Sequence, residues 1–250
     1  MSKLEAVSIT KSFGDNTILQ DVSLRLEPRE IVCLLGVSGG GKTTLFNVLS
    51  GLTLPDRGQV FLDGREITGK AGHISYMLQK DLLMPYRTVL DNIALPLIIK
   101  GAPKKEARRK ALEHFAEFGL SGTEKQYPAQ LSGGMRQRAA LIRTLAPNPE
   151  LLLLDEPFSA LDFQTRLAVC DDVAAILRKE QKTAILVTHD LSEAVSMADR
   201  VLVLSRRPAT ICANLKLSFE KSDLTPFARR NEPEFRTYFN QIWRELNQYG

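Results

Sequence analysis

Residues 31–44 read IVCLLGVSGGGKTT, and this stretch decides the fold class of the chain. The apolar run Ile31–Leu35 is typical of a strand that is buried on both faces of a parallel sheet. The residues that follow, Gly36–Thr43, fit the pattern G-x-x-x-x-G-K-[ST] and precede a helical pattern that begins at Thr44. A buried strand, a glycine-rich loop and a helix in this order predict a phosphate-binding loop.

Glycines give this loop its chemistry because they let the backbone wrap tightly, so that successive N–H groups point into one concavity and hold phosphate oxygens. The first turn of the following helix adds a partial positive charge. We expect the Lys42 ammonium to reach the β- and γ-phosphates of a nucleotide and the Thr43 hydroxyl to bind Mg²⁺. The alternative is a glycine-rich turn before an ordinary helix, and the preceding buried strand disfavours it.

The composition of the 250 residues is that of a folded domain, with 44% hydrophobic and 25% charged residues. These fractions exclude intrinsically disordered, collagen-like and disulfide-scaffold proteins. The net charge of +4 is too small to require a nucleic acid or a membrane surface as partner. Three cysteines without a CxxC pair predict neither a disulfide framework nor a zinc site.

The apolar runs of the sequence are all much shorter than the roughly 20 residues of a membrane-spanning helix. The first five residues carry no hydrophobic export signal. We therefore expect the chain to stay in a reducing cytoplasm. If it works at a membrane, another subunit must cross the bilayer.

Outward from the loop, predicted buried strands alternate with helical stretches along most of the chain. Residues 4–26 alternate apolar and polar side chains, which predicts short half-buried strands with a turn at residues 13–16. Continuous apolar runs at Leu151–Leu154, Ala184–Val187 and Val201–Leu204 predict further buried strands. This alternation is typical of an α/β domain with a largely parallel sheet.

The segment between about Arg87 and Asn148 is predicted to be mainly helical. The stretch from Lys104 to Phe118 places its apolar residues on one face and its Lys and Arg residues on the other. The apolar set consists of Ala107, Ala111, Leu112, Phe115 and Phe118. A basic face can bind nucleic acid, but no aromatic side chains interleave with these charges, so a solvated helix face is favoured.

A pair of carboxylates follows the predicted strand Leu151–Leu154. Asp155 ends this strand at the carboxyl edge of the sheet, where open α/β sheets bind their ligands. Asp155 can hold Mg²⁺ through water, and Glu156 can orient or deprotonate an attacking water. A strand followed by an acidic turn is the alternative, and the phosphate loop in the same chain makes it the weaker one.

Two further polar residues follow predicted strands. His189 comes after the strand 184–187, where a neutral imidazole can donate a hydrogen bond to a γ-phosphate, although a structural histidine is the commoner case. Gln79 follows residues 74–78 and carries a neutral side chain able to contact both a metal ion and a water. Neither residue is distinctive by itself.

Residues 131–138, LSGGMRQR, add a second anion-binding feature. Ser132, Gly133 and Gly134 precede a predicted helix over Met135–Leu145, and its N-terminus attracts negative charge. One nucleotide on one subunit has no use for two such cradles. Two copies arranged head to tail do, because each copy can then cap the ATP held by the phosphate loop of the other.

The order of these motifs resembles the ATP-binding subunit of an ABC transporter. The motifs are the phosphate loop Gly36–Thr44, Gln79, the signature Leu131–Met135, the stretch Leu151–Pro157, Ser159–Asp162 and His189. The resemblance covers roughly residues 4–205. It implies an α/β fold of the P-loop NTPase class, in which a RecA-like core carries an N-terminal antiparallel β subdomain and an inserted α-helical subdomain. The ATP-binding core would span 1–86 and 149–210, the helical signature subdomain 87–148, and a tail 211–250.

The resemblance also implies roles for single residues of an ATPase that uses ATP and Mg²⁺. Gln79 matches the lid glutamine that contacts the metal, Glu156 the catalytic base and His189 the switch histidine. Phe13 matches the aromatic that stacks on adenine, although tyrosine is commoner there. The other ATP-binding residues of the same chain would be Gly36, Val37, Ser38, Gly39, Gly40, Gly41, Lys42, Thr43 and Thr44, with Thr43 and Asp155 at the metal. The residues that contact the ATP of the other copy would be Ser132, Gly133, Gly134 and Asp162.

One signature position departs from the family pattern, because Met135 stands where the family usually has glutamine. Residues 76–93 and 204–208 look like the corresponding segments of the ATP-binding subunits of importers for nitrate, sulfonates, taurine and pyrimidine vitamin precursors. This subtype implies a homodimer at the cytoplasmic face of the cell membrane, two permease subunits, a solute-binding protein and no nucleic acid. Residues from about 80 to 95 would then face a coupling helix of the permease.

The tail from about Pro233 to Asn247 carries large apolar residues at helical spacing, namely Phe235, Tyr238, Phe239, Ile242 and Trp243. A helix packed on the core is the favoured interpretation, and a regulatory or dimer contact is the alternative.

Two other functions share parts of the motif set. A DNA-repair or chromosome ATPase needs a long coiled coil between Lys42 and Asp155, which are only 113 residues apart, and a translation factor needs two cassettes in one chain.

Overall fold

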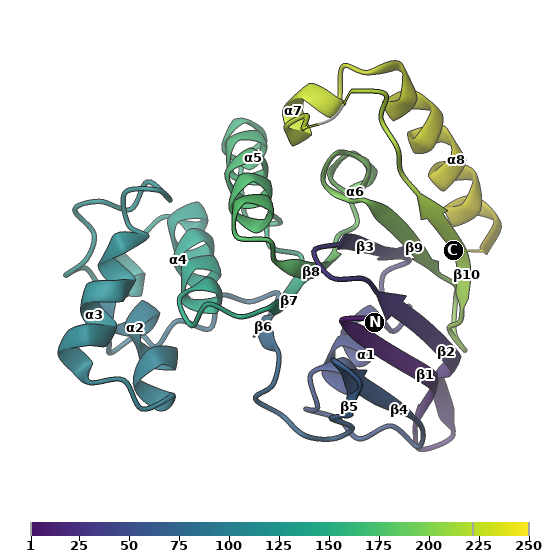
Figure 1. Ribbon diagram of the computed structural model, residues 1–250, viewed down its shortest axis with the longest axis horizontal. Helices are drawn as coiled ribbons and strands as arrows, with labels where there is room; N and C mark the ends of the chain where they lie inside the picture. The colour runs from purple at the N-terminus through teal and green to yellow at the C-terminus, as the bar shows by residue number, and fades with distance from the viewer. Residues whose placement is uncertain (1, 222, 250) are drawn as a thin grey trace.

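The computed structural model describes residues 2–221 and 223–249, which form two β-sheets with helices around them (Figure 1). The first sheet is antiparallel and has the strand order β2-β1-β4-β5. Its strands are β1 (Leu4–Phe13), β2 (Asn16–Leu26), β4 (Arg57–Leu62) and β5 (Arg65–Glu66). The turn between β1 and β2 lies where the sequence predicts it, but both strands are long rather than short. Register shifts along β1 let its ten residues curve while they pair with two neighbours.

The second sheet has six strands in the order β10-β9-β3-β8-β7-β6. They are β3 (Ile31–Gly36), β6 (Ser75–Met77), β7 (Leu151–Asp155), β8 (Thr183–Val187), β9 (Arg200–Leu204) and β10 (Ile211–Lys216). All neighbours pair in parallel except β10, which runs antiparallel to β9. The predicted parallel sheet is therefore confirmed, and the carboxyl ends of β3, β6, β7 and β8 meet at one edge.

Strand β3 shows why this sequence needs cover on both faces of the sheet. Ile31, Cys33 and Leu35 pack into one hydrophobic core, whereas Val32 and Leu34 pack into another. The second core contains the buried side of α1 (Lys42–Leu49) and one face of the antiparallel sheet. The first core is covered by α5 (Phe163–Lys179), α6 (Leu191–Met197) and the remaining helices. The phosphate loop is thus anchored by a strand that is buried on both sides.

Helices α2 (Val89–Ile99), α3 (Lys104–Glu113) and α4 (Gly133–Leu145) lie together to one side of the second sheet, on the left of Figure 1, and a short 3-10 turn η1 (Pro128–Gln130) precedes α4. The longest of the three helices has 13 residues, so the described part of this segment contains no long coiled coil. The Thr88 side chain caps α2 by accepting from the Asp91 N–H.

The predicted helix over 104–118 is only partly correct, because α3 ends at Glu113. Beyond it, Phe115 and Phe118 are still buried, but the backbone reaches them through tight turns such as the Phe115 N–H to Leu112 O bond. Leu112, expected on the apolar face, is 43% exposed. The turns rotate the two phenylalanines into the core, so a continuous helical face is not needed.

The tail folds as α7 (Pro226–Arg229) and α8 (Pro233–Tyr249), which packs beside β9, β10 and α6. Ile242 is fully buried, and Phe235, Tyr238 and Phe239 pack partly buried against the first core. The packed helix is therefore confirmed, except that Trp243 is 53% exposed because it lies on the outer side of α8. Within residues 2–221 and 223–249, no helix is both long and apolar enough to span a bilayer.

Candidate active site

The glycine-rich loop between β3 and α1 lies against the connection that follows β9. A Cβ on Gly36 would come within 2.8 Å of the Leu204 carbonyl oxygen, so this position requires glycine. Gly41 caps α1 with a left-handed φ of 105°, and a Cβ there would meet the Ile18 side chain at 3.0 Å. Close packing on two sides therefore shapes the loop and aims the N-terminus of α1 at its concave side.

Lys42 is the first residue of α1 and is 8% exposed. Its ammonium donates hydrogen bonds to the Gly36 and Val37 carbonyl oxygens, both at 2.8 Å, and therefore spans the loop. Burial lowers the pKa of Lys42, while the neighbouring Glu156 and Asp155 carboxylates act in the opposite direction. The cation is thus held at the concave side of the loop, where the sequence predicts phosphate contact.

Asp155 ends β7 beside the loop and is 3% exposed. The Thr43 hydroxyl donates to its Oδ2 at 3.2 Å, and the Tyr76 hydroxyl lies 3.4 Å from the same oxygen. Burial raises the pKa of Asp155 and that of Tyr76. The Thr43 and Asp155 oxygens are hard donors, and a Mg²⁺ ion that arrives with a nucleotide needs only one or two such protein ligands. These residues therefore fit the predicted metal contact.

Glu156 lies at the centre of a polar cluster formed by three strand ends. The Gln79 amide donates to its carboxylate at 2.9 Å, and the His189 Nδ1 lies 3.5 Å from the other carboxylate oxygen. Glu156 has a left-handed φ of 48°, and its N–H donates to the Val187 carbonyl at 2.9 Å. This turn directs the carboxylate toward the phosphate loop instead of along β7, so the three predicted residues are brought together.

These residues line one cavity of about 420 Å³ at the carboxyl edge of the parallel sheet. Its walls hold most of the predicted residues, namely Ser38, Gly39, Gly41, Lys42, Thr43, Thr44, Gln79, Asp155, Glu156 and His189, together with Arg207. Gly36, Val37 and Gly40 belong to the same loop but do not line the cavity. Phe13 ends β1, is 54% exposed and has the Lys11 ammonium 5.3 Å from its ring centroid, also outside the lining set.

The signature residues lie apart from this cavity. Ser132 caps α4 by accepting from the Met135 N–H, and Gly133 and Gly134 form the first turn of that helix. Asp162 caps α5 in the same way, with the Thr165 N–H as donor, and this bonding lowers the pKa of Asp162. None of these four residues lines the phosphate cavity of its own chain.

Three residues of the site were missed by sequence reasoning. The Gln137 amide, one helical turn after Gly134, donates to the Glu156 carbonyl and accepts from the Ala160 N–H, both at 3.0 Å. Its spacing on the signature helix could have revealed it. Tyr76 lies on the strand that leads to Gln79, where its position was readable but its hydroxyl contact was not. Arg207 had no local signal, because only the folding of the β9–β10 connection brings it to the loop.

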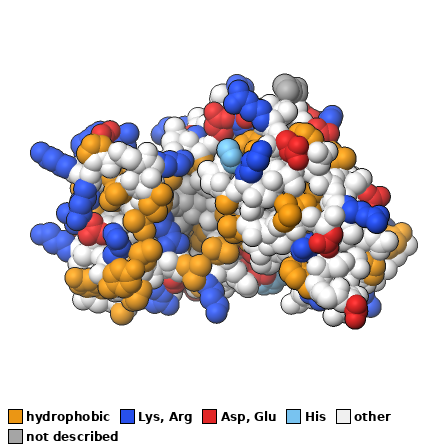
Figure 2. Space-filling model, turned by 90° about the horizontal axis from the view of Figure 1, so that it is seen from below, with side chains coloured by type: hydrophobic (Ala, Val, Ile, Leu, Met, Phe, Trp, Pro, Cys, Tyr) orange, Lys and Arg blue, Asp and Glu red, His pale blue; other side chains and the backbone are white. Residues whose placement is uncertain are grey.

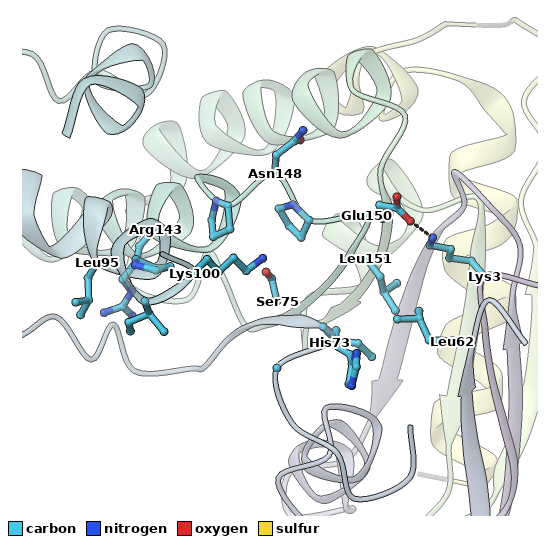
Figure 3. A pocket seen from close by; sticks show the side chains of 16 residues that line it. Lys3, Leu62, His73, Ser75, Leu95, Lys100, Arg143, Asn148, Glu150 and Leu151 are labelled. Atoms are coloured by element: carbon cyan, nitrogen blue, oxygen red, sulfur yellow. Dashed lines mark hydrogen bonds and ion pairs between the residues drawn. The ribbon is translucent and has the colours of Figure 1, made fainter. Parts of the chain in front are cut away.

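A larger cavity of about 620 Å³ lies at the opposite edge of the sheet, where β6 and β7 begin. Lys3 pairs with Glu150 at one side of the cavity, and Lys100, at the C-terminal end of α2, and Arg143 of α4 also line it (Figure 3). In Figure 2 the surface is hollowed between the left-hand part, which carries α2 and α3, and the remainder of the molecule. This cavity contains none of the predicted nucleotide or metal residues.

The chain is similar in sequence to a known family and to several named proteins. A family model described as ABC transporter matches residues 19–159, which is more than half of the chain. An uncharacterised ABC transporter ATP-binding protein of Bacillus subtilis, YtlC, is 48% identical over 92% of this chain and 89% of its own length. The chain belongs to the ABC transporter family.

Other ABC relatives carry more specific names. The nitrate import ATP-binding protein NrtD of Synechocystis is 36% identical over 96% of this chain and 93% of its own length. The formylaminopyrimidine import protein ThiZ of Halalkalibacterium halodurans (42%) and the taurine import protein TauB of Escherichia coli O157:H7 (37%) cover 82% and 93% of this chain, and 79% and 92% of their own lengths.

Among solved structures, the dimeric ATP-binding cassette MJ0796 bound to ADP and Pi superposes with a TM-score of 0.78 and 30% identity. The alignment covers 86% of this chain and 99% of that chain. The predicted ABC cassette fold is therefore confirmed, and this ABC chain is an ATPase.

Proposed function

We propose that two copies of this ABC ATPase close head to tail around two ATP molecules and drive import of a small nutrient through a separate membrane permease. The observation that carries the proposal is the single cavity in which Lys42, Asp155, Glu156, Gln79 and His189 converge. These five side chains come from four segments of the chain, and together they supply a cation, a metal ligand, a base and two further hydrogen-bonding groups.

Within this site the residues divide the work of hydrolysis. Lys42 and the loop N–H groups hold the β- and γ-phosphates, so that charge developing on the leaving oxygens is stabilised. A Mg²⁺ ion bound with ATP would be held by Thr43, Asp155 and Gln79 and would neutralise phosphate charge. Glu156 accepts a proton from the attacking water, which the Gln79 amide helps to orient.

His189 and the signature complete the proposed cycle. The imidazole lies beside Glu156 and donates a hydrogen bond to the γ-phosphate, so it responds when that phosphate leaves. Ser132, Gly133 and Gly134 do not line the cavity of their own chain and are therefore available to the ATP of a second copy. The dimeric state of the MJ0796 cassette supports this arrangement.

Residues 80–86, which follow Gln79 and are called the lid loop here, supply part of the surface for the permease. Leu82 is 54% exposed and Tyr86 72% exposed, and both follow Gln79 in the chain. Ile99, at the end of α2, is 75% exposed, and Figure 2 shows hydrophobic side chains gathered over this part of the molecule. Exposed apolar groups beside a site residue fit a surface that a membrane subunit covers. Such a partner places the complex at the cytoplasmic face of the cell membrane.

The cargo class follows from the relatives rather than from the site. The names of NrtD, ThiZ and TauB refer to import of nitrate, formylaminopyrimidine and taurine, and we propose a cargo of this class, including sulfonates. A solute-binding protein would deliver it to the permease. Uptake of labelled nitrate, taurine, alkanesulfonates and pyrimidines by cells with and without this chain distinguishes these cargoes.

Substitution of the proposed base tests the hydrolytic assignment. We expect Glu156→Gln to bind ATP but to lose hydrolysis by roughly 100-fold or more, because a neutral amide does not accept the proton of the water. The trapped protein should accumulate as an ATP-bound dimer in size-exclusion chromatography with light scattering. Glu150→Gln, at the other end of β7 and outside the cavity, is the matched control. Near-normal hydrolysis by Glu156→Gln would refute the role of Glu156.

A further inference from the structure

The connection between β9 and β10 packs directly under the phosphate loop. Ala209 anchors it to β2, since its N–H donates to the Ile18 carbonyl at 2.8 Å and its carbonyl accepts from the Gln20 N–H at 2.9 Å. On the other side, a Cβ on Gly40 would lie 3.5 Å from the Ser205 carbonyl oxygen. The backbone of residues 204–209 is therefore fixed between the loop and the antiparallel sheet.

Arg207 extends from this fixed connection into the nucleotide cavity. One terminal nitrogen of its guanidinium lies 3.9 Å from the position of a Cβ on Gly39, so the group lies beside the loop. Within residues 2–221 and 223–249, its side chain has no hydrogen bond or ion pair. Arg166, by comparison, lies near the Asp190 and Glu193 carboxylates. The Arg207 guanidinium thus borders the cavity, and its N–H groups are available to a ligand because they make no hydrogen bond within the described residues.

The charges around the cavity indicate what the Arg207 guanidinium can bind. Among the residues that the structure describes, the cavity lining holds two carboxylates, Asp155 and Glu156, and two basic side chains of lysine or arginine, Lys42 and Arg207. ATP brings a polyphosphate of about four negative charges, which these two carboxylates repel. A guanidinium offers a planar pair of N–H donors that matches phosphate oxygens. A second cation at the rim would therefore strengthen the binding of a polyphosphate.

We propose that the Arg207 guanidinium binds the polyphosphate of the ATP held by the phosphate loop of the same chain. This inference rests on the proposed nucleotide site. Because β9 and β8 lie on opposite sides of β3, Arg207 approaches the loop from one side, while His189 approaches it from the other. Arg207 is therefore a binding residue that acts on nucleotide affinity and leaves the water-activating groups alone.

The test is nucleotide titration of monomeric protein, followed by steady-state hydrolysis. We expect Arg207→Ala to raise the Kd for ATP and ADP roughly 5- to 30-fold and to raise KM similarly, because a charge-assisted contact is lost. The kcat at saturating ATP should stay within about twofold, since the chemistry is untouched. Arg207→Lys keeps the positive charge but loses the paired N–H donors of the guanidinium, so its Kd should lie between those of the parent protein and Arg207→Ala. Melting curves of all variants report on folding.

Arg206→Ala is the matched control, because it removes the same charge from the same connection but does not line the cavity. Its Kd should equal that of the parent protein. Equal Kd values for Arg207→Ala and the parent would overturn the inference, as would a defect confined to dimer formation. Lys42→Ala tests the site itself: if ATP binding survives that change, the proposed site is wrong, whatever Arg207 does.

Discussion

At the residue scale, the site holds a carboxylate in a place that disfavours its charge. Asp155 is buried, and Glu156 follows it directly in the chain. Burial is the main cause that raises the pKa of Asp155, and the Glu156 charge acts in the same direction, against the Thr43 hydrogen bond. The ionised form therefore costs the folded protein stability until a cation arrives. An unfavourable buried charge of this kind is expected where the function requires a charged group.

Replacement of Asp155 by asparagine separates stability from function. A carboxyl whose folded pKa lies above its unfolded value destabilises the fold at pH values above that folded pKa, and the cost fades as the pH falls below both values. We therefore expect Asp155→Asn to melt at a higher temperature than the parent at pH 8 without nucleotide. The difference should shrink toward pH 4, and Mg²⁺-dependent hydrolysis should be lost. A lower melting temperature than the parent at pH 8 would contradict this account.

At the element scale, the lid loop is fastened to the signature helix α4 by two arginines. Arg136 pairs with the Asp81 carboxylate at 3.1 Å. Arg143, whose pKa is lowered by burial, donates to the Asp81 and Leu82 carbonyl oxygens at 2.6 and 2.8 Å. Gln79, just before these residues, contacts Glu156. The lid loop is therefore connected to both the base and the signature helix, and we expect a movement of the loop under the proposed permease to reach both.

Removal of the second arginine should loosen this connection. We expect Arg143→Ala to speed amide hydrogen exchange over residues 80–86 and to lower kcat severalfold, because Gln79 is no longer held toward Glu156. ATP affinity should change by no more than about twofold, since no phosphate contact is lost. Arg138→Ala is the control, because Arg138 lies on the same helix but donates to Phe118. Unchanged exchange in the lid loop would show that Arg143 does not hold it.

The same elements show how far the sequence reached. Strand β3, the phosphate loop and α1 were predictable because each has a local signal in the sequence. These signals are a hydrophobic run, a glycine cluster and a helical periodicity, respectively. The end of α3 was not, since the turns that bury Phe115 and Phe118 depend on the core they meet. Arg207 was also out of reach, because its place in the cavity comes from pairing between Ala209 and β2. Contacts made through tertiary packing leave no periodicity in the sequence.

At the scale of the whole molecule, the residues of the proposed nucleotide site lie in two separate parts of the chain. The loop, Asp155 and Glu156 lie in one cavity, whereas Ser132 and Asp162 cap helices and do not line that cavity. A single copy therefore covers ATP on one side only. In the proposed two-fold dimer, the signature of each copy would meet the loop of the other, and both sites would be completed at once.

Cross-linking of mixed copies tests this central claim most directly. One copy carries Ser38→Cys and the other Ser132→Cys, both in the Glu156→Gln background. The Glu156→Gln protein without either added cysteine is the control, because it reports any cross-link made by the natural cysteines. The account predicts an ATP-dependent disulfide between the two different copies, and no link within either pure preparation. Links between identical positions, or no link with ATP, would contradict the head-to-tail dimer.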